Sequence, residues 1–146
     1  MRKERRTPYE SHAAHLREQG ERGREKGNTA ERMFIAAWHN YRWKPRWLVE
    51  VRPGTRYEDE REKTDAVILT AIGVPIRIQI KARRISAVRE EMFFRMGIVP
   101  VGVLPRYTPD EVRIQTLLAI DRYYRFRETS LPRTRRAGNN VSSAHR

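Results

Sequence analysis

The chain has 146 residues, with 31 Lys and Arg against 18 Asp and Glu, a formal net charge of +13 at pH 7 and no Cys. It contains no run of apolar residues long enough for a membrane span, no secretory signal and no Cys-based zinc site. We therefore expect a cytoplasmic protein without a membrane partner. A surplus of Lys and Arg indicates a polyanionic partner, because neutralised phosphates release counterions.

The charge divides the chain into three segments. Residues 1–26 form a basic, charged N-terminal extension, and residues 27–128 contain nearly all the apolar and aromatic side chains needed for a folded domain. Residues 129–146 carry four basic and no acidic groups among small polar residues. We predict that this last segment is a disordered basic tail.

The middle segment opens with a predicted helix. Asn28 can accept a hydrogen bond from a backbone N–H of the first turn, and Glu31 can reach back to complete a capping box. Apolar residues then recur at helical spacing as far as Tyr41. This pattern predicts a helix over about 29–42 that ends before Pro45.

Three strands are predicted next, over 47–51, 63–70 and 75–81. The first is closed by Pro53-Gly54, the second has a β-branched and apolar centre, and in the third isoleucines alternate with polar residues. The intervening residues 54–62 are acidic and polar, which favours a loop. The turn between the second and third strands is Ile72-Gly73-Val74. These two strands therefore form a hairpin.

The second half of the domain predicts a helix, a strand and a helix. Ser86 can cap a helix over about 87–96, and the apolar run 98–104 is typical of a strand that is buried on both faces. The start signal Thr-Pro-Asp-Glu at 108–111 predicts a last helix to about residue 126. The order α-β-β-β-α-β-α predicts an α/β fold with a mixed central sheet flanked by helices.

The predicted hairpin contains the residues that indicate chemistry. Gln79 and Lys81 are two apart on a strand and therefore share a face. A three-residue turn centred on Gly73 places Asp65 opposite Lys81, with Gln79 as the diagonal neighbour, whereas a two-residue turn would send Asp65 to the other face. The carboxylate and the amide oxygen suit a hard divalent cation, and the Lys can position or deprotonate water or stabilise charge on phosphate. Glu31 can add a second carboxylate.

The element order together with Glu31, Asp65 and Gln79-x-Lys81 resembles the PD-(D/E)xK nuclease superfamily, which includes restriction endonucleases and Holliday junction resolvases. The resemblance covers about residues 27–105. It implies a restriction endonuclease-like αβββαβ core and a phosphodiesterase site that uses Mg²⁺ or Mn²⁺. It also implies that Asp65 is the central metal ligand, Lys81 the catalytic lysine, Glu31 the helix acid and Gln79 the residue in place of the second acid.

Two departures from the family pattern concern the hairpin. Gln79 replaces the usual acid, as it does in TnsA-like transposon endonucleases, and Thr64 stands where the family usually has Pro. Simpler interpretations stay open for two of the site residues. Asp65 can be a half-exposed strand residue paired with Lys81, and Glu31 can be a capping-box carboxylate only.

Charged residues near the hairpin are candidates for further contacts. One of the acidic residues at 58–62 can reach the metal, or the run is simply solvated. Basic residues that follow or flank the strands suit phosphate contact, and those next to Trp43 and Trp47 suit stacking of unpaired bases, unless these rings pack in the core. The candidate nucleic-acid contacts are Arg83, Arg84, Lys63, Arg77, Arg42, Lys44 and Arg46.

The sequence thus predicts a metal-dependent endonuclease that hydrolyses DNA, with RNA as another substrate to consider. The alternative is a non-catalytic nucleic-acid-binding module with the same basic surface. A homodimer is compatible with the first function, because one site cuts one strand. The geometry that separates the two functions is whether Asp65, Gln79 and Lys81 face one shared cleft.

Overall fold

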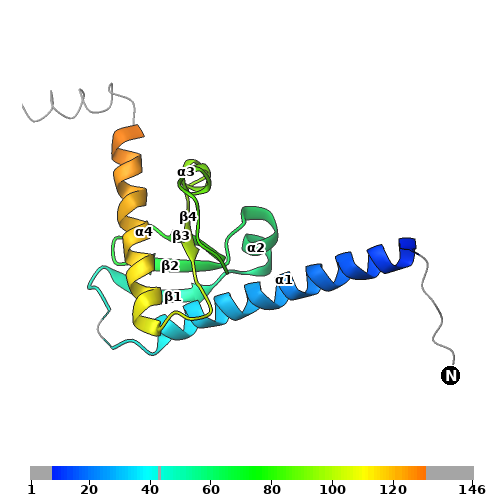
Figure 1. The fold of residues 1–146 in the computed structure, drawn as a ribbon. Helices are drawn as coiled ribbons and strands as arrows, with labels where there is room; N and C mark the ends of the chain where they lie inside the picture. The colour runs from blue at the N-terminus through cyan, green and yellow to red at the C-terminus, as the bar shows by residue number, and fades with distance from the viewer. Residues whose placement is uncertain (1–7, 43, 131–146) are drawn as a thin grey trace, which may run out of the picture.

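The computed structural model describes residues 8–42 and 44–130, with side chains from Arg24 onward (Figure 1). Its elements are α1 (Pro8–His39), β1 (Leu48–Pro53), α2 (Arg56–Glu62), β2 (Ala66–Thr70), β3 (Ile76–Lys81), α3 (Ala87–Arg95), β4 (Ile98–Gly102) and α4 (Pro109–Ser130). The predicted α/β class is confirmed. The predicted tail begins within α4, and its residues 131–146 lie outside the described part of the chain.

The sheet is mixed, with the strand order β1-β2-β3-β4. β1 and β2 pair antiparallel, as do β2 and β3, and β3 pairs parallel with β4 across the connection through α3. β3 shows strict alternation, since Ile76, Ile78 and Ile80 are buried and the residues between them are partly exposed. The predicted parallel crossover is confirmed, and β3 presents a second, partly open face.

The core lies between the sheet and two helices, which contact each other. From α1, Phe34 and Trp38 are completely buried at helical spacing, and α4 contributes Val112 and Ile120. Figure 1 shows α1 running well past the sheet toward its N-terminus. The C-terminal part of α1, which contains Phe34 and Trp38, therefore packs against the sheet. Its side chains that face the sheet are held in position beside the strands.

The predicted start of the first helix is wrong. α1 begins at Pro8 and continues without a break, so Asn28 and Glu31 lie inside the helix. The hydroxyl of Thr29 donates to the carbonyl of Glu25 at 2.9 Å, which is an ordinary bond within a helix. Because the preceding turn already satisfies the backbone, no cap is needed here. The capping-box interpretation of Glu31 is therefore also wrong.

The predicted acidic loop at 54–62 is instead mostly helical. Thr55 caps α2 by accepting from the backbone N–H of Glu58 at 3.2 Å, and the Glu58 carboxylate accepts from the Thr55 N–H at 2.9 Å. Arg52 pairs with Glu58 at 2.8 Å, and this contact is the main cause that lowers the Glu58 pKa to about 2. The cap and the ion pair hold α2 against the end of β1.

The register of the hairpin differs from the predicted one. Ala66 pairs with Ile78, whereas a turn centred on Gly73 would place Ile80 opposite Ala66. The turn begins earlier than expected, because the Gly73 N–H donates to the Thr70 carbonyl at 3.0 Å. The predicted pairing of Asp65 with Lys81 is therefore wrong. The shift is by two residues within the paired part of the hairpin, which ends at Ala66 and Ile78. Asp65 lies just beyond this ladder, where its N–H donates to the Ile78 carbonyl.

One glycine beside the site should tolerate no side chain. A Cβ on Gly54 would lie 2.3 Å from the backbone oxygen of Thr64, whereas a Cβ on Gly27 in α1 would meet nothing within 4 Å. We expect Gly54→Ala to lower the free energy of unfolding by about 2 kcal/mol, because backbone must move. Gly27→Ala is the matched control and should be neutral or raise it by up to about 1 kcal/mol. Urea unfolding measures both, and equal effects would refute the close approach.

Candidate functional site

Two carboxylates meet where α1 passes the hairpin. The Asp65 N–H donates to the Ile78 carbonyl at 2.8 Å, and its carboxylate Oδ2 accepts from the Ile80 N–H at 2.8 Å. These bonds fix the Asp65 side chain against the end of β3. The half-buried Glu31 of α1 lines the same groove as Asp65, and the two carboxyls are close enough to act on each other's pKa. The structure thus brings together the helix acid and the hairpin acid.

Both carboxyls are held in an environment that disfavours their charge. Burial raises the pKa of Asp65 to about 7, opposed by the Ile80 N–H and reinforced by Asp59 and by the charge of Glu31. Burial also raises the pKa of Glu31, with a further contribution from the charge of Asp59, while the hydrogen bond to Asp65 lowers it. Such a pair is stabilised by a shared proton or by a cation.

The side chain of Gln79 contains a buried oxygen that lacks a hydrogen-bond donor among the described residues. Its side-chain Oε1 is buried and has no hydrogen-bond partner among the residues that the structure describes. A buried acceptor left without a donor carries a desolvation cost. Gln79 lies on the partly exposed face of β3, on the same side as Lys81, because the two residues are separated by the buried Ile80. This amide oxygen is therefore available as a ligand.

Lys81 ends β3 on the face of Gln79. Its carbonyl accepts from the Val103 N–H at 2.8 Å, and its ammonium lies 5.9 Å from the centre of the Phe93 ring on α3. Within the described residues it forms no ion pair with Asp65. The interpretation of Asp65 as the partner of Lys81 in a surface ion pair is therefore not supported.

An open groove of about 720 Å³ contains part of the predicted constellation. Glu31 and Asp65 line it, together with His39, whose Nε2 lies 3.0 Å from the Val51 carbonyl. Gln79 and Lys81 are not among its lining residues. The groove therefore joins the two carboxylates but not the amide or the ammonium, so the single cleft shared by Asp65, Gln79 and Lys81 that the endonuclease function predicts is not found in the described part of the chain.

The donor set can be compared with the needs of a metal. No three His, Cys, Asp or Glu side chains form a metal-binding group in the described part of the chain. The oxygen donors available are the carboxylates of Asp65 and Glu31 and the unsatisfied amide oxygen of Gln79. Oxygen ligands of this kind fit Mg²⁺ or Mn²⁺ better than a softer ion.

Asp59 is the neighbour that sequence reasoning did not single out. It lies in the first turn of α2, and it raises the pKa of both Asp65 and Glu31. The signal that could have found it is Thr55-x-x-Glu58, which predicts a helix start and so a fixed position for the next residue.

The predicted basic contacts have different environments. Arg83 and Arg84 are exposed directly after β3, and Lys63 is exposed at the end of α2. Arg77 has a structural role, since it pairs with Glu62 at 3.0 Å and donates to the Met96 carbonyl at 3.1 Å. The remaining candidates lie in the connection from α1 to β1, where Arg42 and Arg46 are exposed, Lys44 is half-buried and Trp43 lies outside the described residues.

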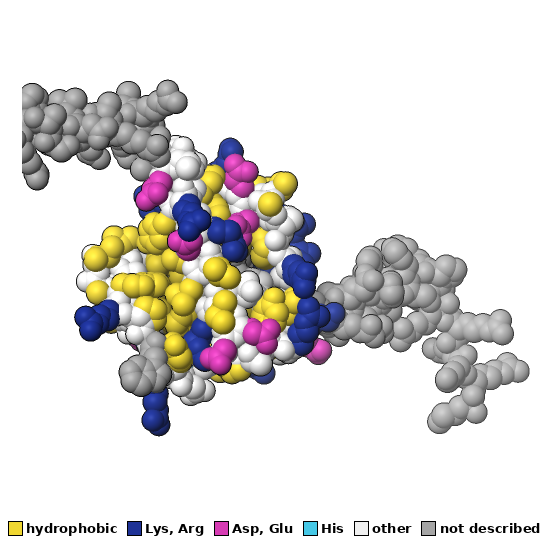
Figure 2. Space-filling view, turned by 60° about the vertical axis from the view of Figure 1, so that its left-hand side comes forward, with side chains coloured by type: hydrophobic (Ala, Val, Ile, Leu, Met, Phe, Trp, Pro, Cys, Tyr) yellow, Lys and Arg dark blue, Asp and Glu magenta, His cyan; other side chains and the backbone are white. Residues whose placement is uncertain are grey.

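One face of the molecule is unsuited to phosphate. Figure 2 shows hydrophobic side chains gathered over α4 and the neighbouring hairpin end. Exposed Tyr124 on α4 and Ile72 in the hairpin turn line one hollow together with Trp47, which is 37% exposed. Nucleic-acid contacts are therefore expected around the end of β3 and not on this face.

Comparison with protein-family models, with curated proteins and with solved structures found no match. No helix of the described residues is long and apolar enough to span a membrane. The function is therefore inferred from the chemistry of the site itself.

Proposed function

We propose that this protein is a metal-dependent endonuclease that hydrolyses DNA phosphodiester bonds. The observation that carries the proposal is the pair of Asp65 and Glu31 carboxyls in one groove, both with raised pKa. The unsatisfied amide oxygen of Gln79 on β3 is a further oxygen donor. The order of helices and strands, apart from the added α2, is the order implied by the resemblance to PD-(D/E)xK nucleases. This order supports a restriction endonuclease-like core.

The side chains divide the chemistry between them. Asp65, Glu31 and Gln79 would hold a Mg²⁺ or Mn²⁺ ion, which when bound lowers the pKa of water and neutralises charge on phosphate. The Ile80 N–H keeps the Asp65 carboxylate oriented at 2.8 Å. Lys81, at the end of the same strand, supplies a positive charge for the developing oxyanion and a site that positions the attacking water.

The basic residues after β3 would hold the substrate. Arg83 and Arg84 lie two and three residues after Lys81 along the chain and are exposed. Phosphates bound there lie close to the lysine without any requirement for base recognition. With a net charge of +13, affinity for DNA should fall steeply with salt concentration.

Cleavage of DNA under controlled metal supply tests the proposal. Supercoiled plasmid and a labelled duplex are incubated with the purified protein and Mg²⁺, Mn²⁺, Ca²⁺ or EDTA. We expect nicking with Mg²⁺ or Mn²⁺ and none with EDTA. Cleavage that persists in EDTA would contradict a metal-dependent site.

A non-catalytic nucleic-acid-binding module is the second candidate. It is favoured by Gln79 in place of an acid and by the absence of a three-ligand group of acidic or histidine side chains in the described residues. It is also favoured by the groove of Asp65 and Glu31, which Gln79 and Lys81 do not line. This function predicts that DNA or RNA is bound but not cleaved with any of the metals. Binding measured by fluorescence anisotropy beside the cleavage assay separates the two.

A further inference from the structure

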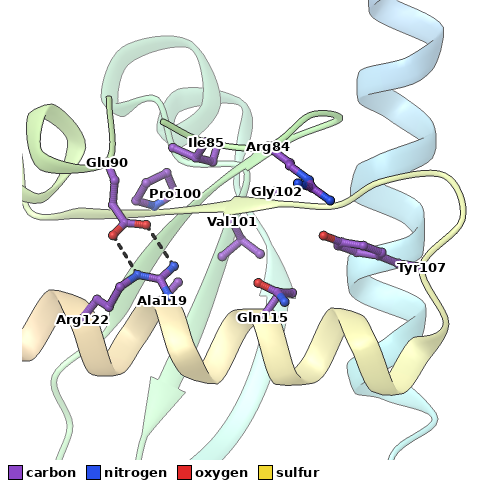
Figure 3. Close-up of a pocket in the computed structure, with 10 residues that line it drawn as sticks. All are labelled: Arg84, Ile85, Glu90, Pro100, Val101, Gly102, Tyr107, Gln115, Ala119 and Arg122. Carbon is purple, nitrogen blue, oxygen red and sulfur yellow. Dashed lines mark hydrogen bonds and ion pairs between the residues drawn. The ribbon is translucent and has the colours of Figure 1, made fainter. Parts of the chain in front are cut away.

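A separate cavity lies beside the ends of the parallel strands (Figure 3). Its volume is about 310 Å³, and it is bounded by the segment after β3, by β4, by the loop before α4, and by α3 and α4. None of the residues that line the acid groove takes part. Ligands of α/β proteins commonly bind outside the carboxyl ends of parallel strands, which is where this cavity opens.

Three polar side chains reach this cavity with unused hydrogen-bonding capacity. Arg84, Tyr107 and Gln115 line it from three different segments, and none has a side-chain hydrogen bond or ion pair within the described residues. Figure 3 shows the Arg84 guanidinium and the Tyr107 hydroxyl at the same end of the cavity, with the Gln115 amide rising from α4. A guanidinium, a phenol and an amide that converge in this way offer both donors and acceptors to a ligand.

The other end of the cavity is closed by an ion pair. Arg122 of α4 donates to both carboxylate oxygens of Glu90 on α3, at 2.8 and 3.0 Å. The Glu90 side chain is 15% exposed and that of Arg122 47%, so the two-bond contact is buried on the side of the carboxylate and open to solvent on the side of the guanidinium. Arg122 is thereby neutralised. Arg84 has no ion-pair partner within the described residues, so its positive charge makes the cavity favourable for an anion.

The rest of the wall suits a flat ring. Pro100, Val101 and Ala119 form the floor between the polar groups, although each is buried and exposes little apolar area. A side-chain amide carries a donor and an acceptor in one plane, as the edge of a nucleobase does, and a tyrosine ring can stack on a base. The volume is at the lower end of the range for ligand cavities, which fits one base with its sugar and excludes a duplex.

We propose that this cavity binds a single nucleotide, with its phosphate on Arg84 and its base against Tyr107 and Gln115. The nucleotide can be free or can be an unpaired residue of a nucleic-acid strand. The strand-bound form rests on the proposed function. The position of the cavity favours the strand-bound form. The cavity residue Gly102 pairs with Lys81 in the sheet, and Arg84 lies three residues after Lys81.

Titration with mononucleotides tests the cavity without any need for cleavage. The probes are the four deoxynucleoside monophosphates, with inorganic phosphate and deoxyadenosine as partial ligands, followed by isothermal calorimetry on the full chain. We expect saturable binding of at least one mononucleotide, weakened about tenfold in Arg84→Ala and in Gln115→Ala. Tyr107→Phe keeps the ring, and its loss of affinity should be smaller. Thermal melting verifies that each variant is folded.

Arg83→Ala is the matched control, because Arg83 is the exposed neighbour of Arg84 and does not line the cavity. Its affinity for mononucleotides should stay within about twofold of the wild type. Absence of saturable binding to the wild type, or equal losses in Arg83→Ala and Arg84→Ala, would overturn the proposal. A protein that fails to cleave DNA leaves this titration unaffected, so the two proposals fail separately.

Oligonucleotides in EDTA distinguish the two sources of the nucleotide. The wild type and the Gln115→Ala variant are compared on a duplex with one unpaired nucleotide and on the fully paired duplex. A wild-type preference for the unpaired nucleotide that Gln115→Ala removes supports the strand-bound form. Equal affinities for both duplexes, with mononucleotide binding retained, support a free nucleotide.

Discussion

Replacing Lys81 by Ala should reduce DNA cleavage by about a thousandfold while leaving most of the DNA affinity in place. Loss of one group that stabilises charge on the reacting oxygen typically costs a factor between about 10² and 10³. Asp65→Ala should have at least as large an effect, because it removes the carboxylate that joins Glu31 to the end of β3. Each substitution changes the net charge of +13 by only one, so most of the electrostatic affinity for DNA should remain.

Single-turnover cleavage with saturating Mg²⁺ measures the first effect, and fluorescence anisotropy in EDTA measures affinity separately. Lys26→Ala is the matched control, since it removes the same charge from an exposed position on α1. It should change cleavage by less than about threefold. Retained cleavage in both Lys81→Ala and Asp65→Ala would rule out the assigned site. Equal loss of cleavage and of affinity would indicate a binding role for the residue instead.

The sheet could be predicted because its signal is local. Ile76, Ile78 and Ile80 alternate with polar residues, and that period of two is the direct consequence of strand geometry. The apolar run of β4 likewise reflects burial on both faces, which its pattern in the structure confirms. The stripe of Phe34 and Trp38 on α1 follows from helical period in the same way.

The errors occur where a neighbouring segment decides the outcome. The pattern Asn28-x-x-Glu31 is a valid helix start only if the chain before it is not already helical, and here α1 is continuous from Pro8. The hairpin register depended on where the turn closes, and the bond from Gly73 to Thr70 sets it. The segment 54–62 was predicted to be a loop because it is highly charged, although Thr55 and Glu58 form a capping box that starts α2. Local patterns alone do not resolve such choices.

The candidate site was predicted in its residues more than in its geometry. Asp65 and Glu31 meet as expected, although the register that led to Asp65 was wrong by two residues. Asp59 raises the pKa of Asp65 and Glu31 because α2 lies close to these two residues. The spacing of residues in the sequence does not predict this proximity. The orphaned oxygen of Gln79 likewise appears only once the surrounding burial is known.

Asp65→Asn should stabilise the metal-free protein at pH 8. The ordinary pKa of an Asp is 3.8, whereas burial raises that of Asp65 to about 7 in the folded state. Between these values the folded protein retains a proton that the unfolded chain has lost, so stability falls as the pH rises from about 4 to 7. Above pH 7 the penalty is complete. A shift of about three pKa units corresponds to about 4 kcal/mol, and solvent screening lowers this figure because Asp65 is only partly buried. Asn keeps an oxygen that can accept from the Ile80 N–H and carries no charge.

Urea unfolding in EDTA at several pH values between 4 and 8 measures this effect as a difference from the wild type. The advantage of Asp65→Asn should be small at pH 4, grow to pH 7 and then stay level. Asp121→Asn, on the exposed side of α4, should show no such growth. Addition of Mg²⁺ at pH 8 should stabilise the wild type and leave Asp65→Asn nearly unchanged, because a cation favours the ionised carboxylate. An advantage that is constant with pH would show that Asp65 ionises freely, and its carboxylate would then have no special need of a metal.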